Sequence, residues 1–356
     1  MPKAWAWDRL RLLCGALLIG VALAGCATRA DQVTVAVGPQ FPEIAPANDY
    51  AALYAPYAMM ATAAYANDNV LTKLNNCPDI AKLGVRQRGD ADDTYTFNKT
   101  VRGWVVYLQR HAWECRFGVI GSLGCPQRLP GCSPVGGLEF QVWRRMVRGQ
   151  CRDVVIAFRG SDRKDLGDWQ SNFRWLYRLA PKFDQYAQVR THIGEVIARV
   201  KESGCNSPKT VFVAVGHSLG GGLAQQAAYA NGTIRYVYAF DPSPVTGFFD
   251  VSAMVRERNV VGLGVDRAYE SGEILALPRI LIENIFPPRA CGPRIRKVGF
   301  SMLTGLPVEQ HNMEALTERL RAAARMPGAD PRRVEARQAA NDCEPSLLML
   351  PLPEIP

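Results

Sequence analysis

The chain has 356 residues, of which 48% are hydrophobic and 21% are charged. This balance excludes a mainly disordered chain, and the length is sufficient for one large hydrophobic core or two small ones. The formal net charge is +9, but no nucleic-acid-binding motif accompanies it, so nucleic acid is not an expected partner.

The N-terminus predicts an export signal. Basic residues precede an apolar run at residues 12–24, which is too short for an ordinary membrane-spanning helix. The run ends in Leu-Ala-Gly-Cys at residues 23–26, a segment that resembles the bacterial lipobox. We therefore expect residues 1–25 to be a lipoprotein signal peptide and Cys26 to carry lipid, with a plain cleaved signal peptide as the alternative.

Lipid on Cys26 predicts an exported protein anchored to a membrane, because each buried methylene group contributes about 0.8 kcal/mol to membrane binding. Ala27 follows the cysteine. In double-membrane bacteria a residue other than Asp at this position favours the outer membrane. Residues 26–48 contain several prolines and little periodic pattern, so we expect them to form a tether between the lipid and the folded domain.

Eight cysteines remain when the signal and the lipid-bearing residue are set aside: Cys77, Cys115, Cys125, Cys132, Cys151, Cys205, Cys291 and Cys343. In an oxidising compartment this even number predicts disulfides, although the sequence leaves their connectivity open. No Cys-x-x-Cys pair with partner histidines indicates a metal site. Neither a metal nor a cofactor is expected.

The central part of the chain predicts alternating strands and helices. Helices are expected at residues 50–65, 186–202 and 223–230, and strands at residues 104–108, 138–147, 154–158, 211–215, 234–240 and 265–269. This order predicts an α/β fold with a mostly parallel central sheet flanked by helices. We expect one domain at residues 49–325 and a polar, proline-rich tail at residues 326–356.

The strongest chemical signal is Gly-His-Ser-Leu-Gly at residues 216–220, between a predicted strand and a predicted helix. Glycines two residues before and after Ser218 allow the strand to turn sharply into the helix, as in the nucleophile elbow of an α/β-hydrolase fold. The helix then directs its N-terminal amides at a developing oxyanion. Ser218 is therefore the predicted nucleophile.

A serine nucleophile needs a base that accepts its proton. His311 is the one histidine that follows Ser218 in the chain, as the order of catalytic residues in α/β-hydrolases requires. It also lies where a loop opens an amphipathic helix, so His311 is the predicted base. The other three histidines are expected to have packing or surface roles: His111, His192 and His217.

The residues themselves leave the catalytic acid open. It should lie between the nucleophile and the base and come directly after a strand. Asp241 does so after the strand at 234–240, and Glu270 or Glu273 does so after the next predicted strand. Such an acid holds the imidazole in the correct tautomer and stabilises its protonated form.

Residues 50–320 resemble the class three lipases, a family that includes the fungal triacylglycerol lipases. The Arg-Gly-Ser segment at residues 159–161, directly after a predicted strand, is similar to the family's first oxyanion segment. The resemblance implies that Ser161 and Leu219 supply the two oxyanion donors.

The segment at residues 267–275 looks like the family's acid segment, with Glu273 at the position of the usual Asp. The resemblance therefore favours Glu273 over Asp241, which stands near a glycine of the family pattern. The family's amphipathic lid would fall at residues 162–168, which are strongly charged here. A phospholipid or a soluble ester is therefore as good a candidate substrate as a triglyceride.

These features together predict a lipid-anchored serine hydrolase that cleaves carboxylic esters. Two alternatives use the same sequence features differently. An acyltransferase would pass the acyl group from the same triad to an alcohol instead of water. A lipoprotein that retains the fold without turnover is the other alternative, and the presence of Ser218 and His311 argues against it.

Overall fold

The computed structural model describes residues 29–38, 41–65, 104, 107–108, 110–119, 138–160, 185–276, 278–279 and 292–334. Its strands are β1 (Gln32–Val37), β2 (Glu43–Pro46), β3 (Trp113–Val119), β4 (Phe140–Val147), β5 (Gln150–Phe158), β6 (Val211–His217), β7 (Ile234–Phe240), β8 (Gly264–Glu270) and β9 (Arg294–Phe300). The helices of this part are α2 (Ala47–Ala63), α7 (Gln185–Glu202), α8 (Leu219–Ala230), α9 (Ala253–Asn259), α11 (Pro307–Gln310) and α12 (Met313–Ala324).

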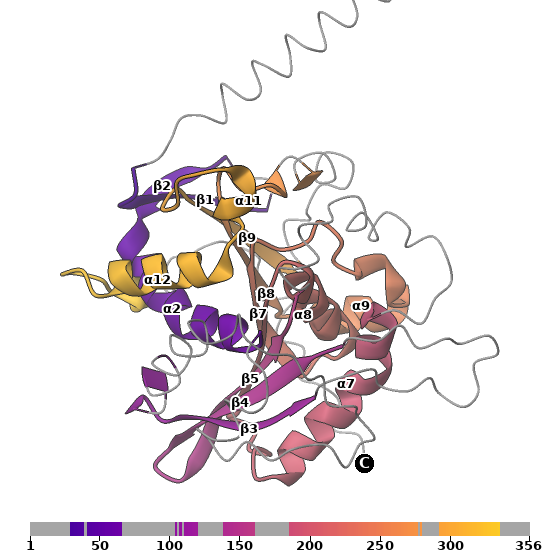
Figure 1. Ribbon diagram of the computed structural model, residues 1–356. Coiled ribbons are helices and arrows are strands. Elements are labelled where there is room, and N and C mark those ends of the chain that lie inside the picture. The colour runs from indigo at the N-terminus through magenta and orange to yellow at the C-terminus, as the bar shows by residue number, and fades with distance from the viewer. Residues whose placement is uncertain are drawn as a thin grey trace, which may run out of the picture.

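The strands of the described part form one nine-stranded sheet in the order β2-β1-β9-β8-β7-β6-β5-β4-β3 (Figure 1). Strands β5 to β9 pair in parallel with their neighbours. At one end of the sheet β1 pairs antiparallel with β2 and β9, and at the other end β4 pairs antiparallel with β3 and β5. The predicted α/β fold with a mostly parallel central sheet is therefore confirmed.

Helices cover both faces of the sheet. Helices α2 and α12 pack together on one face, whereas α7, α8 and α9 lie on the other (Figure 1). Strand β6 shows why the sequence requires two layers: Val213 and Val215 belong to the core beneath α2, and Phe212 and Ala214 belong to the core beneath α8. A strand that is apolar on both faces is typical of a parallel sheet buried on both sides.

The predicted strand at residues 104–108 is wrong. The described residues of this segment, Trp104, Tyr107 and Leu108, are helical, and Trp104 and Leu108 are buried. A spacing of four places both side chains on one face of a helix, and a short continuous apolar run does not distinguish a helix from a strand. The Trp104 indole donates a hydrogen bond of 2.8 Å to Glu318 on α12.

The predicted tether is also wrong from Gln32 onward. This segment forms β1 and β2, and β1 pairs with β9 while Val33 and Val35 enter the core. The alternating Val-Thr-Val sequence fits a strand with one buried face. The signal peptide and Cys26 lie outside the described residues. Within the described part, no helix is long and apolar enough to cross a membrane.

The folded domain extends past the predicted boundary at residue 325. Val334 is buried, and its carbonyl accepts a hydrogen bond of 3.4 Å from Arg296 on β9. The backbone N–H of Asp330 donates to Asp49 on α2 over 2.8 Å. The tail therefore begins later than predicted, and residues 335–356 lie outside the described part.

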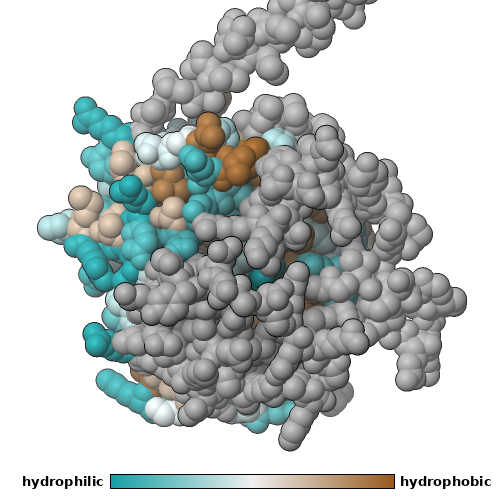
Figure 2. Space-filling view, viewed as in Figure 1, coloured by the Kyte–Doolittle hydropathy of each residue, from teal (hydrophilic) through white to brown (hydrophobic). Residues whose placement is uncertain are grey.

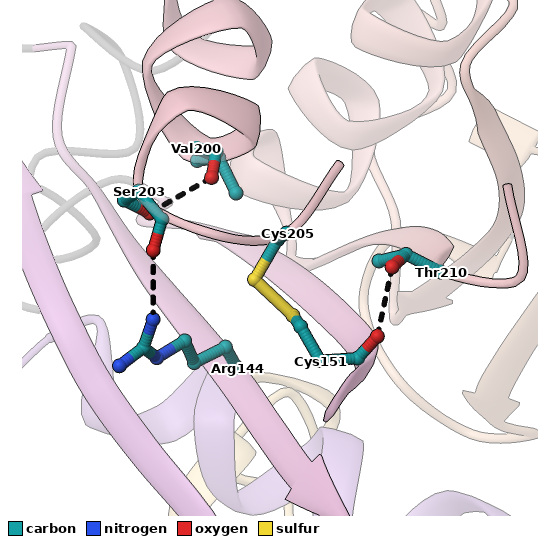
Figure 3. Close-up of a disulfide and its surroundings, with 6 residues drawn as sticks. All are labelled: Arg144, Cys151, Val200, Ser203, Cys205 and Thr210. Carbon is teal, nitrogen blue, oxygen red and sulfur yellow. Dashed lines mark hydrogen bonds between the residues drawn. A yellow bond between two sulfur atoms is a disulfide. The ribbon is translucent and has the colours of Figure 1, made fainter. Parts of the chain in front are cut away.

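One of the expected disulfides is present, between Cys151 at the start of β5 and Cys205 just beyond α7 (Figure 3). Neighbouring hydrogen bonds tie down both ends: Thr210 donates to the carbonyl of Cys151 over 2.8 Å, and Arg144 donates to the carbonyl of Ser203 over 3.1 Å. The side chains of the other six cysteines lie outside the described part of the chain. The bridge therefore links strand β5 of the sheet to the segment that follows helix α7.

Candidate active site

The segment around Ser218 forms a sharp turn from strand to helix. Strand β6 ends at His217, helix α8 begins at Leu219, and Ser218 between them has φ 55° and ψ −123°. Such backbone angles cost a non-glycine residue about 1–3 kcal/mol and persist only where the surroundings enforce them. The N–H of Ser218 donates to the carbonyl of Phe240, at the end of β7, over 3.0 Å.

Two glycines make this turn possible. A Cβ atom on Gly216 would overlap the carbonyl group of Gly220, and a Cβ atom on Gly220 would overlap the carbonyl oxygen of Phe158 at the end of β5. The absence of side chains therefore brings the start of α8 against the loop that follows β5. This is the position where an oxyanion hole is formed in an α/β-hydrolase elbow.

The structure describes one of the two predicted oxyanion donors. Leu219 is the first residue of α8, so its backbone N–H belongs to the first turn, where amides lack partners within the helix. The helix dipole also favours negative charge there. Ser161 lies outside the described residues, although Gly160, directly before it, lies against Gly220.

The predicted base His311 follows α11 and is buried. Its Nδ1 lies 2.8 Å from Oε2 of Glu273, whose side chain is also buried. Its Nε2 is buried and has no hydrogen-bond partner among the described residues. A histidine held through Nδ1 by a carboxylate, with Nε2 left for a reacting group, has the arrangement required of a catalytic base.

Asp241 occupies a different position. It follows β7 with φ 38°, in the left-handed region that favours glycine. Its Oδ1 accepts a hydrogen bond of 2.9 Å from the N–H of Glu270, and its Oδ2 is buried without a partner in the described part. Glu273, and not Asp241, makes the hydrogen bond to Nδ1 of His311.

The environments of the buried carboxyl groups shift their pKa values in opposite directions. Burial raises the pKa of Asp241 well above its usual value, and the charge of Glu273 raises it further. Burial also acts to raise the pKa of Glu273, but the hydrogen bond from His311 and the charge of Arg279 outweigh it, so this pKa is lowered. Glu273 is thus held ionised, whereas the surroundings of Asp241 favour its protonated form.

Arg279 is a site residue that the sequence did not reveal. Its guanidinium forms an ion pair with Oε1 of Glu273, and its Nε donates to the carbonyl of Pro242 over 3.2 Å. The group also lies 5.1 Å from the ring centroid of Tyr269. No motif in the sequence marks Arg279, because its role depends on the contacts with Glu273, Pro242 and Tyr269 that the fold creates.

His217 lines the same site. Its Nδ1 lies 2.9 Å from the hydroxyl of Tyr65, and its ring centroid lies 4.7 Å from that of His311. The sequence predicted a packing role for His217, and this buried position next to His311 fits that role. Tyr65, just beyond the end of α2, has no sequence signal that connects it with the elbow.

Apolar surface gathers around α11 on the face shown in Figure 2. Leu306 is 67% exposed and Val308 is 43% exposed, and both precede His311 by only a few residues. Exposed apolar side chains that gather on one surface favour contact with an apolar ligand or surface.

The site thus combines a serine on a strand-to-helix turn with a buried histidine and carboxylate pair from later loops. Residues 129–240 match the family model of a Tle-like phospholipase domain, which is described as phospholipase-like. The matched segment contains the elbow and ends with β7. The predicted resemblance to a lipase-like family is thereby confirmed.

Solved structures provide two further similarities. A lipase from Rhizopus microsporus var. chinensis is 14% identical, with a TM-score of 0.36, over 68% of this chain and 71% of that one. Lipase II from Rhizopus niveus is 14% identical, with a TM-score of 0.36, over 70% of this chain and 79% of that one. Among curated proteins no sequence matches the chain.

Proposed function

We propose that the protein is a serine hydrolase that cleaves carboxylic esters of lipids, with phospholipids as its substrate class. Ser218 is the nucleophile, His311 the base and Glu273 the acid. The observation that carries this proposal is Nε2 of His311, which is buried and has no hydrogen-bond partner among the described residues, while Glu273 holds Nδ1. The remaining nitrogen is available for the serine proton.

In the proposed reaction, Nε2 of His311 takes the proton of Ser218 as the hydroxyl oxygen attacks the ester carbonyl. The backbone N–H of Leu219, together with Ser161, stabilises the oxyanion. The imidazolium then gives its proton to the leaving alcohol, which departs and leaves an acyl-enzyme. Water repeats these steps and releases the fatty acid, while ionised Glu273 stabilises the imidazolium in both halves of the reaction.

Two observations support a lipid ester as substrate. The segment that carries the elbow is similar to a phospholipase-like domain. Leu306 and Val308 are exposed a few residues before His311, and apolar side chains of this kind can contact acyl chains. A small soluble ester would make less use of this surface.

The proposal includes export and anchoring through lipid on Cys26, supported by the segment at residues 23–26. The chain between Cys26 and the first strand at Gln32 can span at most about 20 Å. Such a short connection would keep the domain next to its membrane, which we propose is the outer membrane. Cys26→Ser should release the protein from the membrane fraction into the soluble fraction.

The activity is tested with the purified mature protein and phospholipid vesicles, with release of fatty acid as the measurement. Wild type should hydrolyse the lipid, and Ser218→Ala should lose at least about 1,000-fold in turnover while its thermal unfolding changes little. A panel of p-nitrophenyl esters should show the same loss. Hydrolysis retained in Ser218→Ala would contradict the proposed function.

A further inference from the structure

Three side chains of the active site form a group that the proposed reaction only partly uses. His217, Asp241 and His311 are all buried, and each offers a ligand atom such that the three atoms lie within 4.8 Å of one another. They come from three separate segments: the end of β6, the residue after β7 and the residue after α11. The carboxyl ends of neighbouring parallel strands meet at one edge of a sheet, which explains why residues distant in sequence converge here.

Both histidines are held through Nδ1. Nδ1 of His311 lies 2.8 Å from Glu273, and Nδ1 of His217 lies 2.9 Å from the hydroxyl of Tyr65. Nε2 is therefore the nitrogen that each imidazole would offer to an ion. Metal-binding histidines in proteins almost always make such a second hydrogen bond, because it fixes the tautomer and the orientation of the ring.

Asp241 is also held by a hydrogen bond at one of its two polar atoms. The N–H of Glu270 donates to Oδ1 over 2.9 Å, and this bond fixes the carboxyl group. Oδ2 is buried and has no partner in the described part of the chain. A buried carboxyl oxygen without a partner is costly, and coordination of a cation is one way in which proteins compensate it.

We infer that Nε2 of His217, Nε2 of His311 and Oδ2 of Asp241 form a binding site for a divalent transition-metal ion of the zinc class. Two imidazoles and one carboxylate are ligands that zinc accepts, with water as the fourth. Bonds of about 2.0 to 2.2 Å would place the ligand atoms roughly 3.4 Å apart. The ion therefore shortens the distances between the ligand atoms, which are at most 4.8 Å, by up to about 1.4 Å, a change that small side-chain rotations can provide.

Metal binding affects activity because the ion and the proton of Ser218 both need Nε2 of His311. An ion on Nε2 of His311 prevents that nitrogen from taking the proton of Ser218, so the metal is a reversible inhibitor and not a cofactor. This consequence rests on the proposed function, whereas binding rests on the geometry of the three ligands. The carboxylates of Asp241 and Glu273 offset the charge of the ion inside the site.

Binding is tested directly with Ser218→Ala, because Ser218 is not a ligand and the variant separates binding from turnover. Titration calorimetry with Zn²⁺ and visible absorption with Co²⁺ should show one equivalent bound. Asp241→Asn on this background should weaken binding at least tenfold, while His111→Asn, a change of an exposed histidine outside the group, should leave it unchanged. Thermal unfolding without metal checks that each variant is folded.

Absence of one-equivalent binding, or equal binding by Asp241→Asn, would overturn the inference. In wild type, Zn²⁺ should block lipid hydrolysis and EDTA should restore it, and Asp241→Asn should need at least tenfold more Zn²⁺ for the same block. Metal binding in a protein without hydrolysis would refute the proposed function and leave the site standing. Hydrolysis that Zn²⁺ does not affect would refute the site and leave the function standing.

Discussion

At the residue scale, the two carboxyl groups nearest to His311 differ in their partners. Glu273 accepts hydrogen bonds from His311 and from the N–H of Leu275, and it also pairs with Arg279. Within the described part of the chain, Asp241 accepts a hydrogen bond from the N–H of Glu270 at Oδ1, and its Oδ2 has no partner. A carboxylate that must stabilise an imidazolium has to be ionised. The lowered pKa of Glu273 fits this requirement, and the raised pKa of Asp241 does not.

The first prediction compares the two groups by isosteric substitution. Glu273→Gln should lower kcat by about 1,000- to 10,000-fold, because the amide favours the wrong tautomer of His311. Asp241→Asn should cost less than about tenfold. Steady-state kinetics with a soluble ester measures both, and circular dichroism checks the fold. A larger loss in Asp241→Asn than in Glu273→Gln would exclude Glu273 as the acid.

The second prediction concerns Arg279, whose charge helps to lower the pKa of Glu273. In Arg279→Met the pKa of Glu273 rises, so on acidification Glu273 becomes protonated at a higher pH than in wild type. The acid limb of the kcat/KM profile should therefore move to higher pH. Arg279→Lys keeps the charge and should stay closer to wild type. Identical acid limbs in Arg279→Met and wild type would show that Arg279 does not act through Glu273.

At the element scale, the loops after the parallel strands are tied to each other by buried polar groups. Glu270, the last residue of β8, accepts hydrogen bonds from the backbone N–H groups of Met302 and Leu303 beyond β9. These bonds connect the loop that carries Glu273 with the loop that leads to His311. Burial nevertheless raises the pKa of Glu270 to about 7, despite the lowering effect of these two donors.

The third prediction is the pH dependence of the free energy of unfolding that follows from the raised pKa of Glu270. Because the pKa of Glu270 is raised on folding, the native state binds more protons than the unfolded state between about pH 4.5 and 7. The stabilising contribution of its protonated form is complete below this window and is lost as the pH rises through it, by at most about 3 kcal/mol. Urea unfolding at a series of pH values should show a smaller decline in Glu270→Gln. An equal decline of the free energy of unfolding in wild type and Glu270→Gln would contradict the raised pKa of Glu270.

The sequence predicts elements well where a pattern is strong and local. Strand β7 was predicted with its observed bounds, Ile234–Phe240, and the elbow follows from its glycines. The strand predicted at residues 104–108 is wrong, because a short continuous apolar run does not distinguish a strand from a helix. Strand β1 was missed because it is short and lies next to prolines, and its pairing with β9 depends on residues more than 250 positions away.

The same distinction applies to the site. Ser218 and His311 have sequence signals, namely a motif and the order of residues along the chain. The preference for Glu273 came from a resemblance, and the structure places this residue at His311. Arg279 and Tyr65 have no such signal, because only tertiary packing brings them to the site.

At the scale of the whole molecule, a disulfide connects the central sheet with the helical layer that contains α7. Cys151 and Cys205 are 54 positions apart, and the loop includes α7. Closing a loop of this length lowers the entropy of the unfolded chain, which stabilises the native state by about 4 kcal/mol in the chain-entropy model.

The fourth prediction is that Cys151→Ala combined with Cys205→Ala lowers the free energy of unfolding by about 2–4 kcal/mol. Urea unfolding measures this change, and wild type treated with a reductant serves as the control. The esterase activity of the folded variant should stay close to that of wild type, because Cys151 lies near the start of β5, whereas the elbow follows β6 beside the end of β5. A variant as stable as the oxidised wild type would contradict the stabilising role.

The proposed mechanism depends most on Ser218 being a nucleophile that His311 activates. The most direct measurement is peptide mapping by mass spectrometry after reaction of the mature protein with a fluorophosphonate. This mechanism predicts one adduct, on Ser218, that forms at least about 1,000-fold more slowly in His311→Ala. An adduct on another residue, no adduct at all, or an equal rate in His311→Ala would contradict it.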